Sequence, residues 1–383
     1  MKRFKKKEHL TEKEKVEERR EEVLARGRKF KYPLQYAKHR LIFISIIIVI
    51  LAFAAAVGLG YVALYKFGYT NDMLYRLTNA IPVPVAKIDD ELVRYSDYLM
   101  IYRSTITPIE QQQGQFGNDA NSDTMRAYYK RAALTEAEDY SYALKLARGL
   151  DLFVSDNMVN NAIAEHRKAG GIERSEESFN QILNDSFNLS LNEYRRMVYL
   201  SLIKVEVSKA IDQPAEQALA DVQSRLAASN YDLVKVANEL ADSDKIIYEE
   251  TGGLVDHLNV DGGRASAAMN LQMGEVSEPF VSTNGDGYYI IKLIAKTDSE
   301  VSYASIKIPF TEFAARVSKV RADGKVTEYI ELSEESAEQK TLGEHGIIYL
   351  CTTFFLTSLR INLHSASFRQ RTQMQTLSDL LWH

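Results

Sequence analysis

The chain has 383 residues, a formal net charge of −5 and a single cysteine, Cys351. This length predicts two or three structural units, and the acidic balance argues against nucleic acid as a partner. One cysteine allows no intramolecular disulfide, and the 7 histidines are too scattered to bind a metal, so neither a metal nor a cofactor is expected.

Positive charge is concentrated in residues 1–40, ahead of a long apolar run. These residues hold 15 Lys and Arg against 7 Asp and Glu, a balance of +8, which leaves −13 for the other 343 residues. Their few apolar positions predict a basic cytoplasmic tail that is either a fluctuating helix or disordered.

Residues 41–66 are predicted to cross a membrane once. The 25 residues 41–65 carry no charged side chain, and a helix of that length spans roughly 37 Å, enough for the hydrocarbon core. Because Lys and Arg precede the run, the N-terminus should stay in the bacterial cytoplasm and the main domains should lie outside the cell membrane. The alternatives are a buried core helix and a cleavable signal peptide with 54–56 (AAA) as its small-residue site, although the run is longer than the apolar part of a signal peptide.

Residues 81–211 are predicted to form a mostly helical domain that opens with a short hairpin. Two prolines force the first residues into extended backbone. Residues 89–90 should form the turn of the hairpin, and Ser96 is placed to cap the helix that follows. The polar residues 110–123 predict a loop.

From residue 124 to residue 211 the apolar positions have helical spacing. Ser190 and Glu193 form the pattern of a capping box, so the last helix should begin between them. The order of the motifs LFVSD, FNQIL and LSLNEYR is similar to that in the N-terminal chaperone domain of the foldase SurA and its relatives. We interpret the apolar residues of these motifs as core rather than as a surface that binds clients: Phe179, Leu183, Tyr194 and Val198.

A second pattern lies within residues 212–310. Residues 271–280 read LQMGEVSEPF and residues 287–293 read GYYIIKL. This succession resembles the C-terminal half of the parvulin (PpiC-type) peptidyl-prolyl isomerases. The resemblance implies a small antiparallel sheet with helices, the FKBP-like superfold, and catalysis of X–Pro isomerisation without a cofactor.

The resemblance also implies where site residues would lie. Active parvulins place two histidines on adjacent central strands, with a Cys or Asp nearby. The Cys/Asp position falls at Asp244 and the C-terminal histidine position at Tyr289, which are therefore the candidate catalytic residues. The candidate substrate-binding residues are Val260, Arg264, Met269 and Leu271. His257 is the single histidine of this region, and we interpret it as an exposed loop residue.

The strand that should carry the first histidine has no room before Pro214. Residues 301–308 (VSYASIKI) resemble it, with Ser305 in place of the histidine. We expect this strand to pair antiparallel with residues 288–294 after a short polar link and to fill the vacant place in the sheet. One face should then carry Val301, Tyr303 and Ser305, and the other Ser302, Ala304 and Ile306.

Residues 311–340 are expected to add a helix and a short strand as a C-terminal extension. Residues 341–383 change abruptly in composition, because they hold the single Trp, the single Cys and three of the 7 histidines. They fit no family pattern, and a frameshifted terminus would explain their composition as well as a functional tail would.

Together these features predict an α+β chain with one transmembrane helix, a SurA-like helical chaperone domain and a parvulin-like domain. The expected function is that of a membrane-anchored extracytoplasmic folding factor of the peptidyl-prolyl cis-trans isomerase family, acting mainly as a chaperone for secreted or envelope proteins. Its partners would be unfolded or proline-containing polypeptides, and the membrane through residues 41–66. Two alternatives stay open: a working isomerase with a divergent pocket, and a non-catalytic envelope scaffold.

Overall fold

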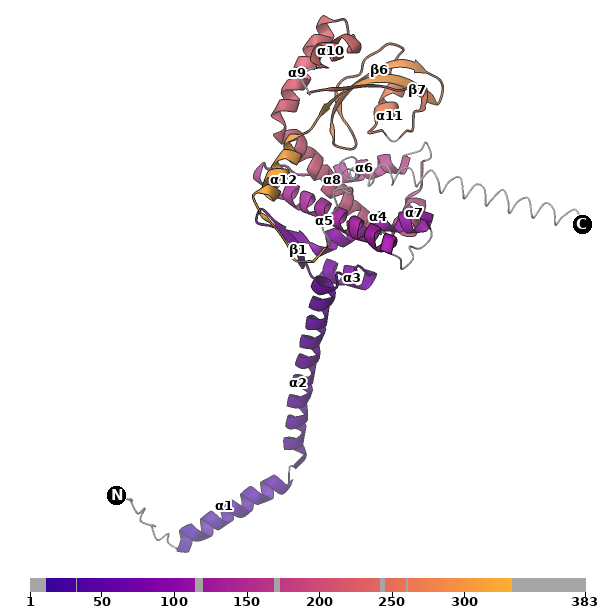
Figure 1. The fold of residues 1–383 in the computed structure, drawn as a ribbon. Coiled ribbons are helices and arrows are strands. Elements are labelled where there is room, and N and C mark those ends of the chain that lie inside the picture. Colours follow the sequence, from indigo (N-terminus) through magenta and orange to yellow (C-terminus); the bar gives the residue numbers. More distant parts are fainter. Residues whose placement is uncertain are drawn as a thin grey trace, which may run out of the picture. The chain divides into compact units, whose positions relative to one another are not determined.

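The computed structural model describes residues 12–31, 33–113, 120–168, 173–241, 245–259 and 261–332. These residues divide into two units, one within Met1–Phe67 and one within Gly68–His383, and each is described separately (Figure 1). The predicted tail 341–383 lies outside the described residues.

The described part of the first unit is helical up to Lys66. Helix α1 covers Glu12–Lys31 and helix α2 covers Pro33–Tyr61, and a π-helical turn, η1 (Val62–Lys66), follows. Within the described residues, the segment Arg40–Lys66 is long and apolar enough to cross a membrane, and most of its large apolar side chains are exposed, whereas Leu64 near its end is buried. An exposed apolar helix of this length is typical of a membrane span or of a signal sequence.

The second unit contains the predicted hairpin. Strands β1 (Pro84–Ile88) and β2 (Glu91–Arg94) pair antiparallel. Asp89 and Asp90 join them with φ angles of 42° and 72°, the left-handed conformation of a type I′ turn, so the predicted turn is confirmed. A third strand, β8 (Val326–Glu328), pairs with the other edge of β1, and the order is β2-β1-β8.

Helix α4 starts at Tyr95, one residue before the predicted cap. Ser96 therefore lies inside the helix, and the prediction that it caps the helix is wrong. The reason is that β2 runs directly into α4: the Tyr95 N–H still donates to the Val83 carbonyl oxygen at 2.9 Å, so no separate capping residue intervenes.

Helices form most of this part of the unit, and α5 packs against both α4 and α8, with α7 against α4 and α6 against α8. They are α3 (Asp72–Ala80), α4 (Tyr95–Gln113), α5 (Ala120–Gly149), α6 (Asp156–Lys168), α7 (Glu176–Phe187) and α8 (Leu191–Ile211). The predicted capping box is confirmed, because Ser190 accepts from the Glu193 N–H and the Glu193 side chain accepts from the Ser190 N–H. Phe179 and Leu183 are buried, as expected of core residues.

The predicted loop at 110–123 is wrong at both ends. Helix α4 continues to Gln113, and α5 already begins at Ala120. Glu and Gln have good helix propensities, so the run EQQQ extends α4 instead of ending it. Gln111 fixes this last turn, because its side-chain amide donates to the Asp185 carbonyl oxygen of α7 at 2.7 Å.

A second sheet follows the helices, with the order β3-β7-β6-β5 and β4 paired to β7. Its strands are β3 (Ile247–Glu250), β4 (Val255–Asp256), β5 (Phe280–Val281), β6 (Gly287–Lys296) and β7 (Glu300–Pro309). Strands β6 and β7 form an antiparallel hairpin, and β7 lies between β6 and β3. The prediction that residues 301–308 fill an interior place in the sheet is confirmed.

Helices pack against both faces of this sheet (Figure 1). They are α9 (Gln213–Ala228), α10 (Leu233–Leu240) and α11 (Arg264–Met269). Ala304 and Ile306 of β7 belong to the apolar cluster with α9 and α10. Val301 and Tyr303 belong to the cluster with α11. The predicted division of β7 into two faces is therefore confirmed, and both faces are buried.

After β7 the chain returns to the first helices through α12 (Glu312–Ala322). The Phe313 ring lies 6.1 Å from the Tyr142 ring of α5, centroid to centroid. The Arg321 guanidinium forms an ion pair with Asp139, also on α5, at 2.8 Å. The segment expected as a C-terminal extension thus packs on α5 and then supplies β8, the third strand of the first sheet.

The chain leaves the helical part after α8 and returns to it at the start of α12. Asp212, which is 1% exposed, contacts the chain at both points. Its Oδ1 accepts from the Ala215 N–H at the start of α9, at 3.0 Å. Its Oδ2 accepts from the N–H groups of Thr311 and Glu312 at the start of α12, at 2.6 and 2.9 Å. One buried carboxylate therefore caps two helices that lie far apart in the sequence.

Replacing Asp212 with Ala should destabilise the second unit by about 2–4 kcal/mol, because two helix starts lose their cap in a buried place. Urea unfolding of the full chain in detergent micelles, followed by circular dichroism, measures this loss. The matched control is Asp232→Ala, which removes the cap of α10 alone, from the Lys235 N–H at an exposed position; it should cost only about 1 kcal/mol. Equal losses in the two variants would contradict the double role of Asp212.

Candidate functional site

The motif at 274–277 (GEVS) runs along the edge of β6 that faces away from β7. Gly274 has a φ of 80°, which favours glycine, and its N–H donates to the Leu293 carbonyl oxygen at 3.0 Å. The Ser277 N–H donates to the Ile291 carbonyl oxygen at 2.8 Å, and the Ser277 hydroxyl accepts from the Ile291 N–H at 3.0 Å. The motif therefore supplies backbone pairing to the strand that carries Tyr289.

Tyr289, predicted above for the position of the C-terminal histidine, is 2% exposed. In the register of the sheet it lies opposite Lys307 of β7. Its hydroxyl donates to Asp286 Oδ2 at 3.1 Å. Its ring stacks on the Phe280 ring with centroids 6.1 Å apart. Polar and apolar contacts thus both hold the phenol ring in one orientation.

Asp286 joins this ring to an ion pair. The Lys307 Nζ lies 2.5 Å from Asp286 Oδ2, and the Ser282 hydroxyl donates to Oδ1 of the same carboxylate. Burial alone would raise the pKa of the Asp286 carboxyl, but the hydrogen bonds from Lys307 and Ser282 outweigh burial and hold that pKa below its ordinary value. The carboxylate is therefore charged at neutral pH.

Arg264 covers the Tyr289 ring from the start of α11. Its guanidinium carbon lies 5.1 Å from the ring centroid, within the range of a cation–π contact. The same guanidinium forms an ion pair with Glu249 of β3 at 2.8 Å. Burial would lower the pKa of Arg264, but the nearby Tyr303 phenol and the hydrogen bond with Glu249 outweigh it and raise the pKa.

Asp261 fixes α11 against the sheet. Both of its carboxylate oxygens lie 3.1 Å from the Ala265 N–H, and Oδ2 accepts from the Tyr303 hydroxyl at 2.5 Å. Burial and the charge of Asp261 raise the pKa of the Tyr303 phenol. The Arg264 Nε also donates to the Asp261 carbonyl oxygen at 2.8 Å. Side chains from β3, β6, β7 and α11 thus converge on one polar network.

The structure brings together two of the predicted site residues, Tyr289 and Arg264. Met269 and Leu271 are partly buried and pack beside the apolar cluster under α11. Asp244 and Val260 lie outside the described residues.

Ser305 and His257 are placed differently from each other. Ser305 is buried, and its hydroxyl lies 3.4 Å from the Glu249 carbonyl oxygen. His257 follows β4, at the end of β7 that begins with Glu300, and its Nδ1 lies 2.7 Å from the Ser299 carbonyl oxygen. Glu300 and Lys307 are seven residues apart on one strand, roughly 23 Å, so His257 lies at the end of the sheet away from Tyr289.

The sequence analysis missed Asp286, Lys307, Asp261 and Ser282. Lys307 could have been predicted from the sequence, because it lies two residues after Ser305 and therefore on the same face of β7. Asp286, between two glycines of a hairpin, reads as an ordinary turn residue. Among the described residues, no group of three or more His, Cys, Asp or Glu side chains is placed to bind a metal ion.

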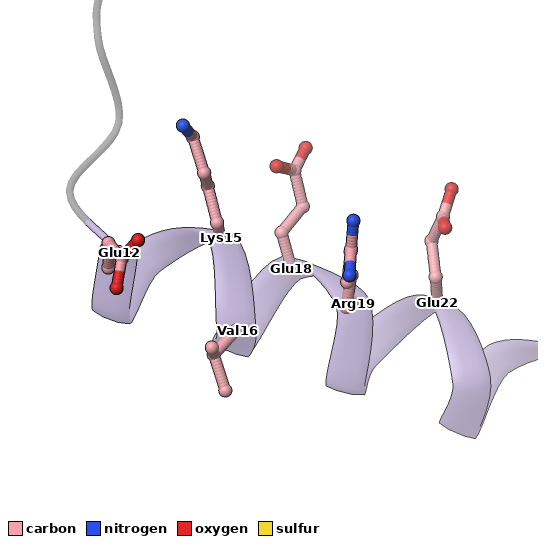
Figure 2. A pocket seen from close by; sticks show the side chains of 6 residues that line it. All are labelled: Glu12, Lys15, Val16, Glu18, Arg19 and Glu22. Carbon is pink, nitrogen blue, oxygen red and sulfur yellow. The ribbon is translucent and has the colours of Figure 1, made fainter.

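A hollow on α1 offers no comparable site. Figure 2 shows that its lining comes from one helix, with charged side chains that stand away from the helix and Val16 on a different side. The lining residues are Glu12, Lys15, Val16, Glu18, Arg19 and Glu22. A binding pocket is concave and encloses its ligand, which one helix surface cannot do.

Comparisons with known proteins agree with this architecture. A family model of the SurA-like N-terminal domain matches residues 34–207. A model of the PPIC-type PPIASE domain matches residues 201–295, so the two matches together span more than half of the chain. The chain belongs to the SurA/PrsA-like family. Neither the curated proteins nor the solved structures gave a match. This SurA/PrsA-like protein thus combines a chaperone-type domain with a parvulin-type domain, the composition of a parvulin-family folding factor.

The ion pair of Asp286 should make the stability of this SurA/PrsA-like protein depend on acid. The folded pKa is depressed, so the unfolded chain takes up a proton at higher pH, and stability is lost as pH falls from the ordinary aspartate range through the folded pKa. Urea midpoints measured between neutral pH and about pH 3 should fall less steeply for Asp286→Asn than for the parent chain. The exposed Asp298→Asn variant is the control and should follow the parent chain. Parallel curves for all three proteins would contradict the role of this pair.

Proposed function

We propose that this chain is a membrane-anchored, extracytoplasmic folding factor that acts mainly as a chaperone and has weak or no prolyl isomerase activity. The observation that carries the proposal is the network around Tyr289, in which a phenol and paired charges stand where active parvulins have a histidine. The chaperone part of the proposal is supported by the SurA-like domain that the family model matches.

The chemistry of X–Pro isomerisation explains why this network is unfavourable for catalysis. The uncatalysed barrier is about 18–20 kcal/mol, and an enzyme lowers it by gripping the proline ring and stabilising the twisted amide. Here the Arg264 guanidinium already covers the buried Tyr289 ring, and the Lys307 ammonium is engaged by Asp286. A proline ring would have to displace a charged group from its partners, which costs more than entering an apolar pocket.

The client is an unfolded or proline-containing polypeptide in this proposal. Met269 and Leu271, partly buried beside an apolar cluster, are the proposed contacts for its apolar side chains. When an apolar client side chain covers these residues, apolar surface is removed from water and the free energy of binding becomes more favourable. Asp244 and Val260 remain candidates by family resemblance only.

The anchor is the segment Arg40–Lys66, whose length and composition suit a single membrane crossing. The excess of Lys and Arg in residues 1–40 favours a cytoplasmic N-terminus. The family works outside the cytoplasm, so the folded unit would then work there while tethered to the cell membrane.

The full chain, purified in detergent, should accelerate isomerisation of a proline-containing tetrapeptide weakly or not at all. The reason is the missing imidazole and the charged cover on Tyr289. The variant Tyr289→Phe tests whether any residual rate uses the phenol hydroxyl, and we expect it to leave that rate unchanged. A rate close to that of an ordinary parvulin assayed beside it, reduced by Tyr289→Phe, would establish the rival function of an isomerase with a divergent pocket.

A second assay separates a chaperone from an envelope scaffold. The full chain should suppress aggregation of several unrelated unfolded proteins at near-stoichiometric amounts, because a chaperone recognises exposed apolar segments rather than one partner. A protein that protects none of them and binds a single envelope component would be a scaffold.

Protease added to intact spheroplasts should digest epitopes placed after residue 70 and spare an epitope placed within residues 1–31. This outcome follows from the positive charge ahead of the apolar segment. Permeabilised spheroplasts are the control, since both epitopes should then be cut. Protection of the C-terminal epitope in intact spheroplasts would reverse the proposed topology, and loss of residues 1–40 from the mature protein would indicate a cleaved signal peptide.

A further inference from the structure

Helix α3 presents an apolar stripe that the rest of the described residues leaves exposed. Met73, Leu77 and Ile81 are 79%, 43% and 56% exposed. They follow each other at intervals of four residues, so they lie on one side of the helix and its C-terminal end. Three large apolar side chains in a row are more than the scattered exposure usual on a protein surface.

Another side of α3 is fixed to the folded helices. Leu74 and Tyr75 are buried. The Arg103 guanidinium of α4 lies 4.4 Å from the Tyr75 ring centroid, and it forms an ion pair with Asp72 at 3.0 Å. These contacts prevent α3 from rotating about its own axis, so the apolar stripe points in a fixed direction relative to the folded unit.

The chain that leads into α3 is also bound to the folded unit. The Lys130 ammonium of α5 donates to the Gly68 carbonyl oxygen at 3.3 Å. Gly68 follows Lys66, the last residue of the candidate membrane segment, by two residues, and so lies within roughly 7 Å of it. The exposed residues Phe67 and Tyr69 flank Gly68, and aromatic side chains are enriched at the interface between membrane and water.

We propose that the stripe of Met73, Leu77 and Ile81 inserts into the interfacial layer of the extracytoplasmic leaflet, with the exposed Arg76 beside it facing lipid phosphate. This inference rests on the proposed membrane anchor. The occupant is lipid rather than a second copy, because the short stretch of chain from Lys66 to Asp72 limits the distance between α3 and the membrane at any protein concentration. An interfacial helix of this kind buries its apolar side in the boundary between headgroups and acyl chains. The folded unit would then stand on the membrane in one orientation.

The test uses the full chain in nanodiscs of phosphatidylcholine and phosphatidylglycerol, with Cys351→Ser as background. A polarity-sensitive fluorophore is attached at Leu77→Cys, and the matched control is Val234→Cys, an exposed apolar position on α10. The label at Leu77 should be quenched by a lipid that carries its quencher near the headgroup, and its quenching by aqueous iodide should be at least about threefold weaker than that of the label at Val234.

Two further measurements separate the possible failures. A label at Val49→Cys, inside the candidate membrane segment, should be quenched by a lipid with a deep quencher; if it is not, the anchor itself is wrong. If the deep quencher quenches the label at Val49 but iodide quenches the label at Leu77 as strongly as the label at Val234, the anchor is supported and the inference about the stripe is overturned. Protection at Leu77 that appears only with two copies per disc would also overturn it, because a second copy would then be the occupant.

A variant pair controls for folding. Met73→Glu with Leu77→Glu should abolish lipid quenching of a label at Ile81→Cys, because charged side chains oppose burial in the interface. Both residues are exposed, so circular dichroism should remain that of the parent chain. Undiminished lipid quenching in this variant would contradict the proposal.

Discussion

The second unit depends on one buried carboxylate that is shared between two helix starts. The first N–H groups of a helix have no partner within the helix and carry partial positive charge, so two helix starts repel each other unless an anion lies between them. Asp212 supplies that anion to α9 and α12. The chain can therefore leave the helical part and come back to it at one point. The sheet of β3 to β7 is an insertion between α8 and α12, and the helical part is built from segments on both sides of that insertion.

Paired charges also surround Tyr289, in the region that we propose as the counterpart of a parvulin site. Buried ions are costly unless each has a partner, and once paired they hold their side chains in fixed positions. The ion pairs of Lys307 with Asp286 and of Arg264 with Glu249 meet this requirement around Tyr289. The same need for paired ions makes it costly to open a pocket here for a proline ring, because opening would separate the ions. In the function proposed for this chain, the side chains around Tyr289 are held in fixed positions and do not admit a substrate proline.

Local patterns in the sequence predicted most of the elements and some of the pairing. The capping box of Ser190 and Glu193 and the hairpin of β6 and β7 depend on residues close in the chain, so a single sequence reveals them. The polar residues 110–123 were wrongly predicted to form a loop throughout, because Glu and Gln are both polar and helix-forming. The network of Asp286 and Lys307 could not be predicted in full, since it depends on which residues of distant segments reach the same spot. Asp212 could be predicted as the cap of one helix, but not as the cap of a second helix about 100 residues later.

Strand β1 emerges from the ribosome long before β8, the second strand with which it pairs. Ile88 pairs with Val326, about 240 residues further on, and at 5–20 residues per second this interval lasts roughly 12–50 s. All strands of the other sheet lie between these two residues, so that sheet can close first. Until β8 arrives, one edge of β1 has unpaired N–H and C=O groups that can pair with any extended chain nearby. The nascent polypeptide is thus exposed during its own synthesis to the kind of association that folding factors suppress in other proteins, and translation speed between residues 88 and 326 becomes a determinant of its yield.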